Sequence, residues 1–146
     1  MNKSKEILFE KINTFINTIA DFEDVQSGEE FLCYPTTKEI FIDTKNYRAD
    51  EFIDTLFERT NLRDISIFTW CLLHEVGHCM TEQYIDTRAN NHCQYMKKKI
   101  EKGKIASINY YYLADEKRAT NWAIKYATKN LEKVRAFDND IRGLII

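Results

Sequence analysis

The chain has 146 residues, of which 44% are hydrophobic and 30% charged, a composition that excludes intrinsic disorder and suits one folded domain over residues 1–146. Lysine and arginine number 21 against 23 aspartates and glutamates, so the net charge is −2 and direct nucleic-acid binding is disfavoured. No apolar run approaches the roughly 20 residues of a bilayer crossing, so we expect no membrane contact. With only four glycines and one proline, the chain favours helices over a sandwich or barrel.

The cysteine pattern and the N-terminus bear on location. No two cysteines form a C-x-x-C pair, and a chain this rich in apolar residues needs no disulfides, so we expect reduced thiols. The first apolar residues recur at helical spacing instead of forming the continuous core of a signal peptide. Both observations predict a cytoplasmic protein. The four cysteines are Cys33, Cys71, Cys79 and Cys93.

The N-terminal half predicts a helix, a loop and a hairpin. The amphipathic pattern covers about residues 4–22, and Ser27 and Gly28 mark a loop. Two short apolar runs, 31–34 and 39–43, flank a turn led by Pro35, which is typical of a β-hairpin.

The rest of the chain predicts helices. The stretch from Asp86 to Asn91 is polar, and we expect it to be irregular. The expected helices cover residues 51–59 after a cap at Asp50, 64–83, 92–102 before Gly103, and one long helix from a cap at Ser107 to about Phe137.

A cluster of lysines lies in the helix predicted over residues 92–102 and just beyond it. Because the overall charge is balanced, we interpret these lysines as a solvated helix face, not as a nucleic-acid or lipid site. They are Lys97, Lys98, Lys99, Lys102 and Lys104.

The most informative motif is H-E-x-x-H, formed by His74, Glu75 and His78. The two histidines are four residues apart, so on a helix both imidazoles point the same way and can share one metal ion. Glu75 lies about 100° further round the helix, where its carboxylate can reach a water on the ion without being a ligand. Gly77 costs this helix about 1 kcal/mol against alanine, which a close approach by a neighbouring backbone would explain.

A catalytic zinc site needs a third protein ligand and an open fourth position. The metzincin pattern is excluded because Thr81 and Tyr84 occupy the positions of its glycine and third histidine. His92 is the only other histidine, and no spacing argument selects it. Cys71 projects toward the same face as the two histidines, but it lies a full turn from an ion held between them.

Glu116 is the preferred third ligand. It lies on a stripe of helical period with Ala119 and Ala123, so its carboxylate faces inward, where a cation would offset the cost of burying a charge. Asp115 is the fallback ligand. It ranks below Glu116 because its side chain points about 100° away from that of Glu116.

Together, H-E-V-G-H at residues 74–78 and the later E-x-x-A-x-x-W-A, which begins at Glu116, resemble the small zinc metallopeptidases of the ImmA/IrrE type. The resemblance covers about residues 38–127. It implies an α+β, mainly helical, minimal zincin-like fold, in which a short β-hairpin packs on the H-E-x-x-H helix and a C-terminal helix carries the glutamate. The interval between His78 and Glu116 is longer than expected for the family, and we expect the lysine-rich helix to fill it.

The resemblance also implies zinc on His74, His78 and Glu116, with Glu75 as the catalytic base. It implies a zinc-dependent endopeptidase that cleaves a protein substrate, such as a helix-turn-helix repressor of a prophage or mobile element. Tyr112, one helical turn before Glu116, is our candidate for stabilising the oxyanion.

Two alternatives stay open. The chain could be a non-catalytic regulatory module that retains a zinc-stabilised fold. The zinc could also be purely structural, with Cys71 or His92 as a fourth ligand.

Overall fold

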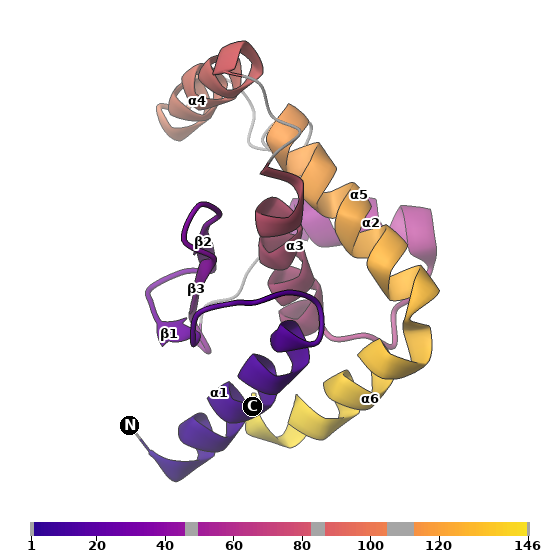
Figure 1. Cartoon of the computed structure of the whole chain (residues 1–146). Helices are drawn as coiled ribbons and strands as arrows, with labels where there is room; N and C mark the ends of the chain where they lie inside the picture. The colour runs from indigo at the N-terminus through magenta and orange to yellow at the C-terminus, as the bar shows by residue number, and fades with distance from the viewer. Residues whose placement is uncertain (1, 46–49, 83–86, 105–112, 146) are drawn as a thin grey trace.

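The computed structural model describes residues 2–45, 50–82, 87–104 and 113–145. As the helical patterns predict, this part of the chain is α+β and mainly helical, with one small sheet (Figure 1). No described helix combines the length and apolar character that crossing a bilayer requires. In chain order the elements are α1 (Lys3–Asn17), β1 (Gln26–Ser27), β2 (Leu32–Tyr34), β3 (Glu39–Ile42), α2 (Asp50–Thr60), α3 (Ile67–Thr81), α4 (Thr87–Glu101), α5 (Ala114–Lys129), α6 (Leu131–Ile141) and the short 3-10 helix η3 (Arg142–Leu144).

The predicted hairpin is confirmed. Strands β2 and β3 pair in antiparallel fashion, with Cys33 opposite Ile40. The prediction of a loop at Ser27 and Gly28 is wrong in part, because β1 adds a short parallel strand to the other edge of β3 and gives the order β1-β3-β2. The N–H of Gly28 also donates to the carbonyl oxygen of Ile42 at 3.0 Å, so this segment is bonded to the sheet.

Helix α3, which carries H-E-x-x-H, is the central element. It lies between the sheet and α5 (Figure 1), and apolar residues on several of its sides are fully buried. Buried apolar residues on several sides of a helix require packing partners on those sides. The fully buried apolar side chains of α3 are Phe68, Trp70, Leu72, Leu73 and Val76.

Helix α3 begins at Ile67, three residues later than predicted, because Ser66 caps it. The Ser66 hydroxyl accepts the backbone N–H of Thr69. The side-chain hydroxyls of Ser66 and Thr69 both donate to the buried carboxylate of Asp138 in α6, at 2.6 Å and 2.5 Å. Arg142 neutralises Asp138 through an ion pair of 2.6 Å. The start of α3 is thereby fixed to α6.

Helix α1 is shorter than predicted and ends at Asn17 instead of near residue 22. The side-chain oxygens of Asn13 and Asn17 accept the N–H groups of Val25 and Phe22, at 2.8 Å and 3.0 Å. These hydrogen bonds occupy backbone N–H groups of the segment after α1, which turns back along the helix instead of continuing it.

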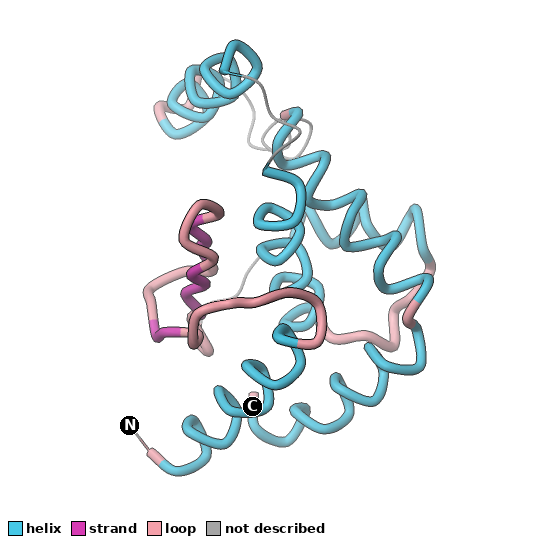
Figure 2. Tube along the Cα trace, viewed as in Figure 1, coloured by secondary structure: helices cyan, strands magenta, loops and turns pink. Residues whose placement is uncertain are grey.

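The long C-terminal helix predicted up to Phe137 is wrong, because the chain breaks at Asn130 into α5 and α6 (Figure 2). Asn130 has φ −122° and ψ 38°, outside the helical region. The break lets α6 pack on α1, where the rings of Phe137 and Phe15 stack with centroids 4.0 Å apart. The predicted cap at Ser107 lies outside the described residues.

The other helices differ less from expectation. Helix α2 confirms the predicted helix over 51–59, but Asp50 is its first helical residue and not the cap before it, so that part of the prediction is wrong. Helix α4 already begins at Thr87, so the expectation of an irregular stretch from Asp86 to Asn91 is wrong for residues 87–91, and Asp86 lies outside the described residues. Gly103 follows α4 with φ +72°, as predicted for a helix-ending glycine, and its N–H bonds the carbonyl oxygen of Ile100 at 3.0 Å.

Candidate metal centre

The packing of α3 on α5 brings three predicted ligands together. His74 Nε2 lies 3.2 Å from Glu116 Oε1, and His78 Nε2 lies 2.7 Å from Glu116 Oε2. One possible ligand atom from each of the three side chains lies within 4.8 Å of the others. Two imidazoles and one carboxylate can therefore hold a metal ion at this point.

The close packing of the two helices depends on a glycine. A Cβ atom on Gly77 would lie 2.5 Å from the carbonyl oxygen of Ala119 and 3.0 Å from its Cα. The neighbouring backbone that the sequence only suggested is therefore α5. With no side chain at residue 77, Glu116 can approach the histidines of α3.

Burial differs among the three ligands. The side chains of His74 and Glu116 are 7% and 4% exposed, whereas that of His78 is 13% exposed and Glu75, next to His74, is also only partly buried. His78 and Glu75 are therefore more exposed to solvent than His74 and Glu116.

The charge of Glu116 and the charges of the two histidines influence one another. Burial alone would raise the pKa of Glu116, but hydrogen bonds with His74 and His78 hold that pKa well below its usual value. Burial would lower the pKa of His78, yet the hydrogen bond and charge of Glu116, together with the charge of Glu75, raise it. Without a metal, the imidazole of His78 is thus stabilised in its charged form by the carboxylate that would share an ion with it.

Thr120 orients His74. Its hydroxyl lies 3.1 Å from Nδ1 of His74, the ring nitrogen opposite the one that faces Glu116. A metal-binding histidine typically has its second nitrogen held in this way, which fixes the ring and its tautomer. Sequence reasoning missed this role, although Thr120 lies four residues after Glu116 and so on the same helix face.

Glu75 lies beside the group of three ligands, and thiols surround it. Burial raises the pKa of the Cys71 thiol to about 12, and the charge of Glu75 adds to the effect. A hydrogen bond with Cys79, burial and the charge of Glu75 raise the pKa of Cys33. The carboxylate of Glu75 is therefore close to the junction of α3 and β2.

The fallback ligand Asp115 has other partners. Its Oδ1 accepts the N–H of Glu116 at 2.8 Å, and its Oδ2 binds Nζ of Lys97 at 2.6 Å. Lys97 is only 16% exposed and lies 3.2 Å from Glu116 Oε2. The prediction of a solvated lysine face is thus wrong for Lys97, while it is confirmed for Lys98, which is exposed.

The remaining candidates are not in the group of three. His92 is exposed on α4, and Cys71 is a buried thiol outside the group. Tyr112 lies outside the described residues, so its proposed role stays a prediction.

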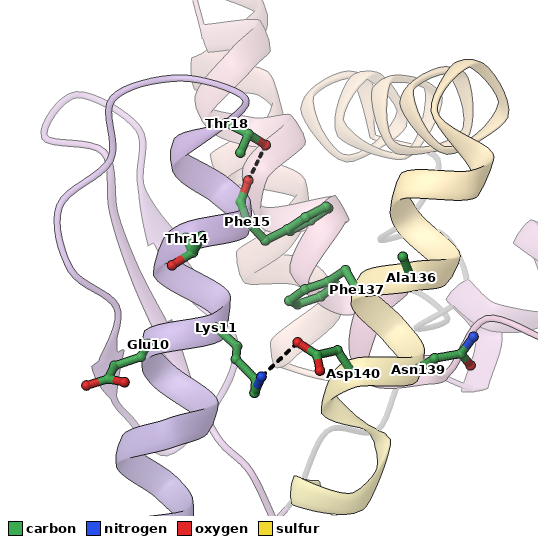
Figure 3. Close-up of a pocket in the computed structure, with 9 residues that line it drawn as sticks. All are labelled: Glu10, Lys11, Thr14, Phe15, Thr18, Ala136, Phe137, Asn139 and Asp140. Carbon is green, nitrogen blue, oxygen red and sulfur yellow. Dashed lines mark hydrogen bonds and ion pairs between the residues drawn. The ribbon is translucent and has the colours of Figure 1, made fainter.

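A wide groove of about 830 Å³ lies elsewhere, between α1 and α6 (Figure 3). Phe15 and Phe137 stack at its floor, and Lys11 bonds Asp140 across it at 2.8 Å. None of the three candidate ligands lines this groove, so it is separate from the metal centre.

No protein-family model, curated protein or solved structure matches this chain. The metal is therefore inferred from the donor atoms. Imidazole nitrogens combined with one carboxylate suit zinc, whereas calcium and magnesium prefer all-oxygen sites. The donor set of His74, His78 and Glu116 therefore fits zinc as a candidate ion.

Proposed function

We propose that this chain is a zinc-dependent endopeptidase with zinc on His74, His78 and Glu116. The observation that carries the proposal is the meeting of these three side chains at the contact of α3 and α5, with the partly buried Glu75 next to His74 on α3. A purely structural zinc would need a fourth protein ligand. Among the described residues the group has three members, and neither His92 nor Cys71 is one of them.

Each residue of the centre has a distinct task in this proposal. When bound, zinc supplies a Lewis acid that makes a water molecule acidic and polarises a peptide carbonyl. The Glu75 carboxylate accepts a proton from the attacking water and returns it to the leaving amine nitrogen. Thr120 holds the ring of His74, and Tyr112 remains the candidate donor to the oxyanion.

The proposed substrate is a protein, and the resemblance to ImmA/IrrE-type peptidases suggests a helix-turn-helix repressor. The partial exposure of Glu75 and His78 supports access of a substrate from solvent.

The test combines metal analysis with cleavage. The purified protein should carry close to one zinc per chain after mild dialysis, measured by elemental analysis. On co-expression with a repressor encoded beside its gene, the wild type should yield a discrete cleavage product. Glu75→Gln should keep its zinc and lose cleavage by about two to four orders of magnitude, since an amide cannot accept the proton.

Glu58→Gln is the matched control, because Glu58 is an exposed glutamate of α2. It should cleave as the wild type does. A chain that neither holds nor takes up zinc would refute the metal centre. A zinc-loaded wild type that cleaves none of several candidate repressors would instead favour the regulatory module, and full cleavage by Glu75→Gln would remove the role of Glu75.

A further inference from the structure

Two neighbouring carboxylates, Asp115 and Glu116, are buried at the start of α5, with side chains 8% and 4% exposed. Two buried negative charges are expensive unless cations or hydrogen bonds compensate them. His74 and His78 contact the carboxylate of Glu116. The carboxylate of Asp115 is paired with a cation from another helix.

Lys97 supplies that cation from α4. Its Nζ lies 2.6 Å from Asp115 Oδ2 and 3.2 Å from Glu116 Oε2, so one ammonium group joins both carboxylates. The distance to Asp115 is that of a strong charge-assisted hydrogen bond. Asp115 in turn is fixed by the N–H of Glu116, at 2.8 Å.

Lys97 reaches the centre from α4, a helix that carries none of the three ligands. Helix α4 lies apart from the sheet and from α1 (Figure 1), and α5 is the helix it packs on most closely. Lys98 within α4 and Lys102 just after its end are exposed, whereas Lys97 is directed into the centre. The segment that separates His78 from Glu116 in the chain thus returns one side chain to the site.

We propose that Lys97 is a positioning residue of the metal centre: held by Asp115, it fixes the carboxylate of Glu116 for the ion. A carboxylate has about four lone-pair sites, so Oε2 can accept a hydrogen bond from Lys97 while Glu116 still offers a lone pair to a metal. Ligating carboxylates in metalloproteins are themselves hydrogen-bonded, and loss of such a partner costs about 10- to 100-fold in metal affinity.

The opposite role can be distinguished from this one. If Lys97 were a competitor that takes the place of the ion, its removal would tighten zinc binding. Its shorter contact is to Asp115, which is not in the group of three ligands, and this favours positioning over competition. The proposal rests on the zinc centre proposed above.

The experiment measures zinc affinity by competition with a chromogenic chelator. Lys97→Met keeps the length of the side chain without its charge, and we expect zinc affinity to fall about 10- to 100-fold. Lys98→Met is the matched control on the exposed side of α4 and should bind zinc as the wild type does. Lys97→Arg, which retains the cation, should recover part of the affinity. Circular dichroism checks that each variant is folded.

A double-mutant cycle separates positioning from a general effect on folding. If Lys97 acts through Asp115, then Lys97→Met and Asp115→Asn should weaken zinc binding together by less than the product of their separate effects. Unchanged or tighter binding by Lys97→Met, or independent effects in the cycle, would overturn the proposal while leaving the zinc centre in place. A wild type without zinc would instead refute the centre itself, and this inference with it.

Discussion

Gly77 of α3 lies directly against the backbone of Ala119 of α5, so close that a Cβ atom on residue 77 would come within 2.5 Å of the Ala119 carbonyl oxygen. This contact lies between the two helices that carry the histidines and the glutamate. The separation of α3 and α5, and thus the distance between their ligands, depends on a missing methyl group.

Gly77→Ala should therefore destabilise the protein, although alanine favours a helix over glycine by about 1 kcal/mol. Both helices must shift, and we expect a loss of about 1–3 kcal/mol in the free energy of unfolding together with weaker zinc binding. Urea denaturation measures the first effect and chelator competition the second. Gly143→Ala is the control, because a Cβ atom there meets nothing within 4 Å. Equal stability of Gly77→Ala and wild type would contradict the tight contact.

Glu116→Gln should weaken zinc binding more than Asp115→Asn does. Glu116 lies 2.7 Å and 3.2 Å from the two histidines, whereas the carboxylate of Asp115 is engaged by Lys97 and by the N–H of Glu116. Zinc competition assays on both variants measure the difference. If Asp115→Asn is the worse variant, Asp115 is the ligand and the assignment is reversed.

Thr120→Val should lower zinc affinity by about 10- to 100-fold, because valine keeps the shape of threonine but removes the hydroxyl that lies 3.1 Å from Nδ1 of His74. Thr120→Ser keeps the hydroxyl and should retain most of the affinity. The comparison isolates the hydrogen bond from packing, since Thr120 is buried. Equal zinc affinity of the valine and serine variants would show that the ring of His74 needs no such support.

In chelator-treated protein, the pair of His78 and Glu116 should make stability depend on pH. Glu116 has a pKa held below its ordinary value of 4.5, so its contribution is present above about pH 4.5 and is lost as the pH falls through the folded-state pKa. His78 has a pKa raised above 6.5, so its contribution is present below about pH 6.5 and is lost as the pH rises through the folded-state pKa. Between about pH 4.5 and pH 6.5, both Glu116 and His78 therefore contribute to stability.

Urea denaturation across pH 3–9 measures this effect. The difference in unfolding free energy between the wild type and His78→Gln/Glu116→Gln should be largest between about pH 4.5 and 6.5. A difference that does not change with pH would show that the pair is uncoupled without metal.

Local patterns predicted the hairpin, the H-E-x-x-H helix and the inward face of Glu116. Each rests on a period or spacing that neighbouring residues determine, such as the four-residue interval from His74 to His78. The close approach at Gly77 was also suggested, because glycine in a helix interior is costly and calls for a packing reason.

The predictions that were wrong share one physical cause: each of these features depends on contacts with residues far away in the sequence. Strand β1 exists because β3 offers its free edge, and a strand of two residues carries no periodic pattern of its own. The break at Asn130 contains neither glycine nor proline, so no local residue type predicts it. It places α6 against α1, and this contact joins distant parts of the chain. Lys97 belongs to a run of lysines in the sequence, and only the fold shows that Asp115 lies within its reach.

The ligands lie on both sides of α4 along the chain, and this order has a consequence for folding. An ion held by α3 and α5 would close the intervening segment into a loop and hold two distant parts of the chain together, as a disulfide does. Unlike a covalent bond, this closure can be withdrawn by a chelator, and its contribution to stability grows with the free zinc concentration. The ion would thus act as a reversible cross-link, whose strength is set by the surroundings of the protein.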